Sequence, residues 1–125
     1  MSHLSSKKTL LVVDDETDIL EILQEFFSDA FQVRIASSVD AALELFKKVP
    51  IDCILTDIKM PGKDGFELIR CVQAQNSKLP IIAMTGHATQ EDIDKVLSAG
   101  IKARVEKPFD LAKLQALIEK SVRGS

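Results

Sequence analysis

Short apolar runs alternate along the chain with longer segments in which apolar residues recur at helical spacing. The short runs predict five strands, at residues 9–13, 32–36, 51–56, 79–84 and 101–106. A continuous run such as 9–13 is typical of a strand buried on both faces of a parallel sheet. Polar and apolar residues alternate in 32–36, so we expect this strand to lie at an edge of the sheet.

The longer segments predict five amphipathic helices, one after each strand. Residues that suit helix starts come just before each apolar face. These are Asp15-Glu16-Thr17-Asp18, Ser37 or Ser38, Asp64 with Glu67, Thr89 with Asp92, and Asp110, while Gly100 suits a helix end. Five strands that alternate with five helices predict an α/β fold with a parallel sheet, helices on both of its faces and right-handed connections.

Length and composition limit the classes of protein to which the chain can belong. Its 125 residues, 46% hydrophobic and 28% charged, predict one soluble globular domain. The net charge of −3 argues against direct binding to nucleic acid. No apolar stretch approaches the ~18 residues of a membrane span, so we expect no membrane insertion. Residues 1–8 are polar and lack the apolar core of a signal peptide.

The cysteines and the chain ends carry less information. Cys53 and Cys71 do not form the spaced set of a disulfide or zinc framework. We therefore expect reduced thiols in a cytoplasmic protein. The last three residues, 123–125, suit either a natural end or a remnant of cloning.

Polar groups follow four of the five predicted strands. The first strand ends at Asp14-Asp15, the third at Asp57, the fourth at Thr85-Gly86 and the fifth at Lys107-Pro108. The carboxyl ends of parallel strands lie at one edge of a sheet, where ligands of open α/β folds bind. We therefore expect these groups to meet in one crevice.

Three carboxylates in one crevice repel each other, and a hard divalent cation such as Mg²⁺ or Mn²⁺ relieves that repulsion. Lys107 can neutralise a further negative charge, Thr85 can donate its hydroxyl to an oxyanion, and Gly86 leaves room for a bulky group. With Asp57 as nucleophile, these groups form a site for phosphoryl transfer. Each residue alone has a structural explanation as a cap, a turn residue or a solvated charge. A purely structural explanation of all of them, however, requires four separate coincidences at four strand ends.

The same motifs resemble the receiver domain of two-component response regulators. They are Asp14-Asp15, Asp57-Ile58-Lys59-Met60-Pro61-Gly62, Thr85-Gly86 and Lys107-Pro108-Phe109, and the resemblance spans about residues 7–122. It implies a flavodoxin-like sheet in the order 2-1-3-4-5, with flexible termini at 1–6 and 123–125. It also implies that the chain is a phosphoacceptor rather than an enzyme, one that assists its own phosphorylation and dephosphorylation.

The resemblance implies a role for each site residue. Asp57 accepts a phosphoryl group from the phosphohistidine of a sensor histidine kinase or phosphotransfer protein. Asp15, Asp57 and the backbone carbonyl of Lys59 bind Mg²⁺ directly, while Asp14 acts through water. Lys107 contacts a phosphoryl oxygen, and its peptide bond to Pro108 is cis.

The resemblance further implies a switch. Thr85 closes on the phosphoryl group, and the change appears on the surface of the fourth helix, fifth strand and fifth helix. A downstream effector or output domain reads that surface, and a homodimer is a further expected partner.

One residue departs from the family pattern. Receivers usually carry Tyr or Phe three residues before the Lys-Pro lysine, and this chain has Arg104. Its head can lie in solvent or pair with an acidic residue. The departure bears on the Thr-to-aromatic relay and on partner binding, and it leaves the phosphorylation chemistry untouched.

Lys59 and His87 lie two residues beyond Asp57 and Thr85, so we expect them to flank the mouth of the site. One interpretation is that they tune water access and the lifetime of the aspartyl phosphate. The other is that they are two exposed polar residues without a role.

Three other functions are open to the same fold. A small phosphatase with an aspartate nucleophile places a second Asp two residues further on, where this chain has Lys59. A flavin-binding protein needs Gly, Ser and Thr after the first strand, where this chain is acidic. A dimerisation or docking module that works without phosphorylation does not need the intact site, although Arg104 is compatible with it.

Overall fold

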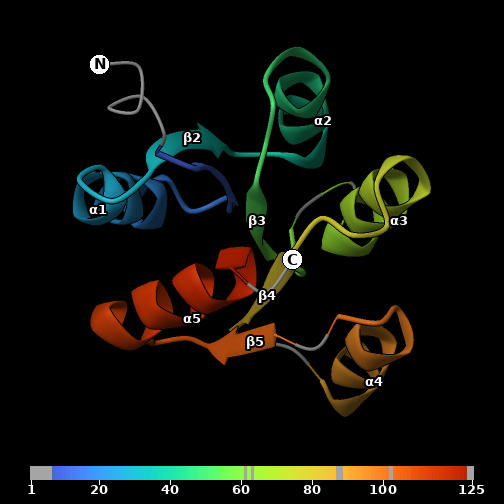
Figure 1. The fold of residues 1–125 in the computed structure, drawn as a ribbon. Helices are drawn as coiled ribbons and strands as arrows, with labels where there is room; N and C mark the ends of the chain where they lie inside the picture. The colour runs from blue at the N-terminus through green and yellow to red at the C-terminus, as the bar shows by residue number, and fades with distance from the viewer. Residues whose placement is uncertain (1–6, 61, 63, 87–88, 102, 124–125) are drawn as a thin grey trace.

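The computed structural model describes residues 7–60, 62, 64–86, 89–101 and 103–123. It contains one five-stranded parallel sheet in the order β2-β1-β3-β4-β5 (Figure 1). The strands are β1 (Thr9–Val13), β2 (Gln32–Ala36), β3 (Cys53–Asp57), β4 (Ile81–Thr85) and β5 (Ala103–Glu106). This order confirms the predicted doubly wound, flavodoxin-like fold.

Each strand is followed by a helix, and the helices cover both faces of the sheet (Figure 1). α1 and α5 lie on one face, while α2, α3 and α4 lie on the other. The helices are α1 (Thr17–Phe27), α2 (Val39–Lys48), α3 (Gly65–Gln75), α4 (Gln90–Ser98) and α5 (Leu111–Arg123). Among the described residues, no helix combines the length and hydrophobicity needed to cross a membrane.

Two apolar clusters, one on each face of the sheet, form the core. Alternate residues of β1 show the division: Leu10 and Val12 pack with α1 and α5, whereas Leu11 and Val13 pack with the opposite helices. β1, β3 and β4 are buried at every position, as expected for strands covered on both faces. Exposed and half-buried residues alternate in β2, which confirms its predicted place at an edge.

The predicted helix starts and the predicted helix end are confirmed in position. At α3, Asp64 caps the helix through the amides of Phe66 and Glu67, while the Glu67 carboxylate, expected to complete a capping box, pairs with Arg70. Ser38 and Asp110 accept backbone hydrogen bonds at the starts of α2 and α5. Thr89 and Asp92 form a reciprocal capping box at the start of α4. Gly100 has φ +84° after α4, and the amides around it complete a Schellman turn that ends the helix.

Three strand starts differ from the predicted ones because apolar side chains extend beyond the hydrogen-bonded ladder. β3 begins at Cys53 rather than Ile51, β4 at Ile81 rather than Leu79, and β5 at Ala103 rather than Ile101. α5 continues to Arg123, one residue into the segment predicted to be a flexible terminus. The prediction for residues 1–6, 124 and 125 lies outside the described residues.

Both cysteines are free, in line with the expectation of reduced thiols. Cys53 is buried in β3, and this burial, with the nearby charge of Asp52, raises the pKa of its thiol to about 12. Such a thiol is unreactive near neutral pH.

Candidate functional site

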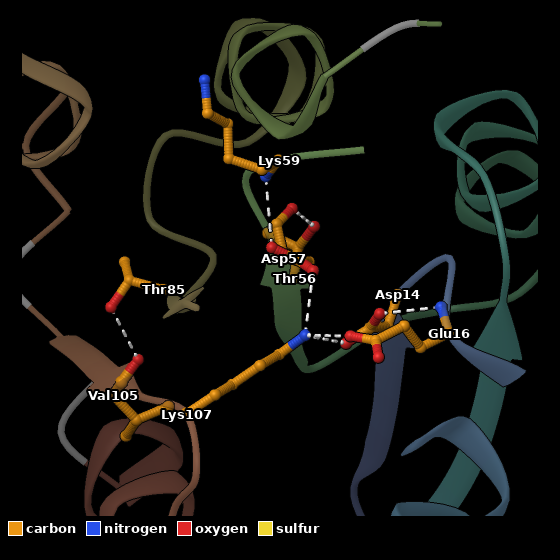
Figure 2. A network of polar contacts seen from close by, with 8 residues as sticks. All are labelled: Asp14, Glu16, Thr56, Asp57, Lys59, Thr85, Val105 and Lys107. Carbon is orange, nitrogen blue, oxygen red and sulfur yellow. Dashed lines mark hydrogen bonds and ion pairs between the residues drawn. The ribbon is translucent and has the colours of Figure 1, made fainter. Parts of the chain in front are cut away.

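The carboxyl ends of β1, β3 and β5 deliver opposite charges to one crevice (Figure 2). Lys107 follows β5 and extends across the sheet edge to the acids. Its Nζ atom lies 2.7 Å from Asp14 Oδ2 and 3.0 Å from Asp57 Oδ2. A third carboxylate, that of Glu16, lies 3.2 Å away through its Oε1 atom. The strand ends that the sequence singled out do come together, and one ammonium group joins them.

Oxygen ligands suited to a divalent cation gather at the same point. Asp14, Glu16 and Asp57 each offer a carboxylate oxygen, and these atoms lie within 4.8 Å of one another. A donor set made only of oxygen fits Mg²⁺ better than Zn²⁺. The Lys107 ammonium contacts all three carboxylates, so it neutralises charges that a bound cation would neutralise instead.

Glu16 is the member of this cluster that sequence reasoning missed. Its place just before an apolar helical face assigned it to a helix start, and it is indeed the N-cap residue of α1. Its side chain makes no capping hydrogen bond there, which leaves the carboxylate able to pair with Lys107. The available signal was its position directly after Asp14-Asp15.

Asp14 and Asp15 take different positions although they are neighbours. Asp14 is fully buried, and its Oδ1 accepts the backbone N–H of Glu16 at 2.9 Å. Asp15 is exposed in the wall of the adjoining cavity, outside the three-carboxylate cluster. Its direct contact with Mg²⁺ therefore stays a prediction.

Burial and pairing shift the proton equilibria of this cluster. Burial raises the pKa of the Asp14 carboxyl above its ordinary value of 3.8, although the hydrogen bond from Lys107 opposes that rise. Burial alone would lower the pKa of Lys107, but hydrogen bonds to Asp14 and Asp57 outweigh it and the pKa is raised. Lys107 therefore remains an ammonium group at physiological pH.

Backbone packing fixes the Asp57 carboxylate at the end of β3. Asp57 is buried, and its Oδ1 accepts the backbone N–H of Lys59 at 3.1 Å. Gly65 packs directly beneath this turn, and its N–H donates to the carbonyl of Ile58 at 3.1 Å. A Cβ at position 65 would lie 2.7 Å from the Ile58 Cα and would collide with the Asp57 carbonyl, so the turn requires glycine there.

Gly86 has a comparable role beneath Lys107. A Cβ at position 86 would lie 3.2 Å from the Lys107 Cδ atom. The sequence predicted that Gly86 leaves room for a bulky group, and the group beside it here is the aliphatic stem of Lys107. The Lys107–Pro108 peptide bond is cis, as the resemblance implied.

The other predicted site residues surround this centre. The Thr85 hydroxyl donates to the Val105 carbonyl at 3.1 Å and points away from Asp57 (Figure 2). The side chain of Lys59 also points away, with its Nζ 3.3 Å from Asp92 Oδ2. Arg104 is exposed on β5 and pairs with Glu106 at 3.7 Å, which is the second of its two expected arrangements. His87 lies outside the described residues.

A cavity of about 680 Å³ opens beside the Asp57 carboxylate. Its polar end contains Asp15, Asp57 and Lys107, and its other wall is apolar. That wall comes from α1 and from the segment after Lys107, with the side chains of Ile19, Ile22, Leu23, Pro108, Phe109 and Leu111. The site is thus reachable from solvent beside an apolar surface.

The fold and site together define a flavodoxin-like α/β domain with a centre of three carboxylates and one ammonium group at the carboxyl edge of its sheet. The sequence profile of the response regulator receiver domain matches residues 10–119, and the chain belongs to that family. Receiver domains are phosphoacceptor switches of two-component systems that histidine kinases phosphorylate, and many relatives carry output domains.

Individual relatives agree with this membership. The chain is 31% identical over 121 residues to the transcriptional regulatory protein FixJ of Bradyrhizobium diazoefficiens, covering 96% of this chain and 59% of FixJ. It is 31% identical to the regulatory protein AtoC of Escherichia coli, covering 91% of this chain and 25% of AtoC. The chain thus spans about three fifths of the length of FixJ and a quarter of the length of AtoC.

A solved structure of similar size shows the same fold. The CheY-like receiver domain protein from Methanospirillum hungatei JF-1 superimposes with a TM-score of 0.89 at 28% identity. The match covers 94% of this chain and 95% of that one.

Proposed function

We propose that this chain is a phosphorylation-controlled signalling switch in which Asp57 accepts a phosphoryl group in a Mg²⁺-dependent reaction. The observation that supports this most is the joint contact of Lys107 with Asp57, at 3.0 Å, and with Asp14, at 2.7 Å. A buried nucleophilic carboxylate, an acidic cluster and an ammonium group beside an accessible cavity are the parts that phosphoryl transfer to a carboxylate needs.

The acidic side chains are the candidates for holding Mg²⁺. Asp15, Asp57 and the carbonyl of Lys59 would bind it directly, and Asp14 would act through water. Glu16 joins this set because its carboxylate lies within the same oxygen cluster. When bound, the cation supplies positive charge that offsets repulsion between the carboxylates and the incoming phosphoryl oxygens.

Asp57 performs the covalent step. One of its carboxylate oxygens attacks the phosphorus of a phosphohistidine, an O–P bond forms, and the N–P bond breaks to release the histidine. The Lys107 ammonium, already 3.0 Å from Asp57, is placed to contact an oxygen of the transferred group. The phosphoryl group adds a charge of about −1.5 to −2 and new acceptor oxygens to the site.

Thr85 supplies a switch because its present partner can be exchanged. Its hydroxyl now donates to the Val105 carbonyl on β5. Turning toward a phosphoryl oxygen would break that bond and loosen the contact between β4 and β5 near the site. The expected outcome is a change on the surface formed by α4, β5 and α5, which an effector, an output domain or a second copy of the chain would read.

The phosphodonor partner is expected to be a sensor histidine kinase or a phosphotransfer protein. The apolar wall beside the cavity suits contact with a protein donor, since Ile22 is 55% exposed on it. This feature favours a macromolecular donor over free small phosphate compounds.

Arg104 is proposed to act in partner recognition rather than in the chemistry. It is exposed on β5, which β4 separates from the strand that ends at Asp57, and it pairs with the exposed Glu106. We expect Arg104→Ala to change dimerisation or effector binding more than the phosphorylation rate, measured by sedimentation and by phosphoryl incorporation on the same samples. Equal losses in both would contradict this assignment.

Lys59 and His87 are proposed to tune the lifetime of the aspartyl phosphate. Lys59 follows the acceptor carboxylate and lines the cavity. Unchanged dephosphorylation rates in Lys59→Ala and His87→Ala would remove this proposal.

The experiment that tests the function is intact mass spectrometry after incubation with acetyl phosphate, with and without Mg²⁺. We expect one phosphoryl adduct that requires Mg²⁺ and is absent in Asp57→Asn. Lack of any adduct would favour a docking module that works without phosphorylation. Turnover of many acetyl phosphate molecules per chain would favour a phosphatase.

A further inference from the structure

Lys59 connects the acceptor carboxylate with α4, because its two ends make contacts in opposite directions. Its backbone N–H donates to Asp57 Oδ1 at 3.1 Å. Its side chain points away from that carboxylate, and its Nζ lies 3.3 Å from Asp92 Oδ2 (Figure 2). Lys59 therefore links the site to α4, which lies on the same face of the sheet as α3.

Asp92 is a fixed partner for this lysine. Asp92 is only 6% exposed, and its Oδ2 also accepts the backbone N–H of Thr89 at 3.0 Å in the capping box of α4. The Thr89 N–H and, to a lesser extent, the Lys59 ammonium lower the pKa of the Asp92 carboxyl. Asp92 thus stays charged and cannot leave this position without uncapping α4.

The side chain of Lys59, in contrast, is half exposed and can exchange its partner without leaving its own charge buried and unpaired. The side chain of Lys59 is 51% exposed, and this residue forms part of the wall of the cavity beside Asp57. Before phosphorylation, Lys107 already pairs with Asp57, and it shares its single charge with Asp14 and Glu16. A phosphoryl group on Asp57 would bring a charge of about −1.5 to −2, which exceeds the single charge of Asp92.

We propose that Asp92 is a positioning residue that holds the Lys59 ammonium on α4 while Asp57 is unmodified. A phosphoryl group on Asp57, or a dianionic donor entering the cavity, then competes with Asp92 for that ammonium. When the Lys59 ammonium moves to the phosphoryl group, the N-terminal turn of α4 loses its charged partner. The pair therefore reports the state of Asp57 to α4 by a route that does not use Arg104. This inference rests on the proposed phosphorylation of Asp57.

The test measures the phosphorylation rate of each variant as a function of acetyl phosphate concentration, at saturating Mg²⁺. Asp92→Asn keeps an oxygen that accepts the Thr89 N–H and removes the charge that holds Lys59. We expect the half-saturating acetyl phosphate concentration to fall roughly two- to five-fold, the range of one exposed ion pair, with the maximal rate kept. In a Lys59→Met background, Asp92→Asn should have no effect.

Asp94→Asn is the matched control. It removes the same charge from the same helix, but Asp94 is exposed and its Oδ1 accepts from Gln90 at 3.0 Å. Equal shifts in Asp92→Asn and Asp94→Asn would overturn the proposal, since only long-range charge would then matter. Persistence of the Asp92→Asn effect without Lys59 would overturn it as well.

A second measurement covers the case in which Asp92→Asn does not fold. Lys59→Met leaves the capping box intact, and hydrogen exchange can follow the amides of residues 90–93. We expect phosphorylation to speed this exchange in the native chain and to change it much less in Lys59→Met. An equal response in both would overturn the proposal. If the native chain gains no phosphoryl group at all, the proposed function fails instead.

Discussion

Lys107 and Lys59 lie beside the same carboxylate, yet their surroundings differ. The side chain of Lys107 is 14% exposed and contacts three carboxylates, two of which are buried. The side chain of Lys59 is 51% exposed and pairs with one carboxylate. Lys107 lies within the charge cluster of the site, whereas Lys59 lies at its rim.

These unequal surroundings indicate which contacts can be exchanged during function. Removing one member of a buried ion cluster leaves a charge without solvent or partner, which destabilises a protein strongly. An exposed pair contributes little, because water replaces the lost partner. Changes at Lys107 should therefore affect folding as well as chemistry, while changes at Lys59 should affect mainly the response to the phosphoryl group.

The largest expected effect follows Lys107→Met. In Mg²⁺-free buffer, it should lower the free energy of unfolding by about 2 kcal/mol, because the buried Asp14 carboxylate loses its cation. This loss of unfolding free energy is smaller than that for breaking a fully buried ion pair, because Lys107 borders the cavity. Urea unfolding measures it.

Lys59→Met is the control for this change. It should lower the free energy of unfolding by at most about 0.5 kcal/mol. Added Mg²⁺ should stabilise Lys107→Met more than the native chain, since the ammonium no longer competes for the carboxylates. Similar losses in the two lysine variants would refute the contrast between them.

Gly86→Ala should have a smaller effect that is confined to Lys107. The new Cβ would lie 3.2 Å from the Lys107 Cδ, so the stem must shift by a few tenths of an ångström. We expect a loss of about 1 kcal/mol in the free energy of unfolding and a lower phosphorylation rate. Urea unfolding and phosphoryl incorporation measure these.

The double variant Gly86→Ala with Lys107→Met isolates the cause of this loss. Without the lysine stem, the added methyl group meets less resistance, so the stability cost of Gly86→Ala should shrink markedly. A cost that is unchanged in the double variant would show that the methyl group strains the backbone instead.

The smallest effect is expected at Asp92, and it should depend on pH. The lowered pKa of its carboxyl means that the folded chain binds this proton less readily than the unfolded chain. Its contribution to stability is therefore present above its ordinary value of 3.8 and is lost as the pH falls through the lower, folded value. Asp92→Asn should cost about 0.5 kcal/mol at neutral pH.

Urea unfolding between about pH 5 and about pH 3 checks this sign. The difference between Asp92→Asn and the native chain should narrow toward the acidic end. A gap that widens on acidification would contradict the assigned shift.

The sequence allowed the fold and the centre of the site to be predicted because both follow from periodicity. Five apolar runs set the strands, and parallel strands must end at a common edge, so Asp14, Asp57 and Lys107 had to converge. The cap of Thr89 and Asp92 was predictable for a similar reason, since it depends on spacing within one helical turn.

Contacts of long side chains across elements were not predictable in this way. The pairing of Glu16 with Lys107, and of Lys59 with Asp92, depends on rotamers and on where α1 and α4 lie on the sheet. The present direction of the Thr85 hydroxyl likewise depends on the neighbouring carbonyl of β5. Spacing along the chain carries no information on such choices.

The two outer strands have a further consequence for association between copies of the chain. Within the part of the chain that the structure describes, β2 and β5 each pair with one neighbour and leave one side of their backbone without a strand partner. Both carry exposed charge, with Arg34 on β2 and the Arg104–Glu106 pair on β5. Charges on edge strands discourage another chain from adding a strand there and so guard against aggregation. Any dimer of this chain should therefore assemble through side-chain faces, with its sheets remaining separate.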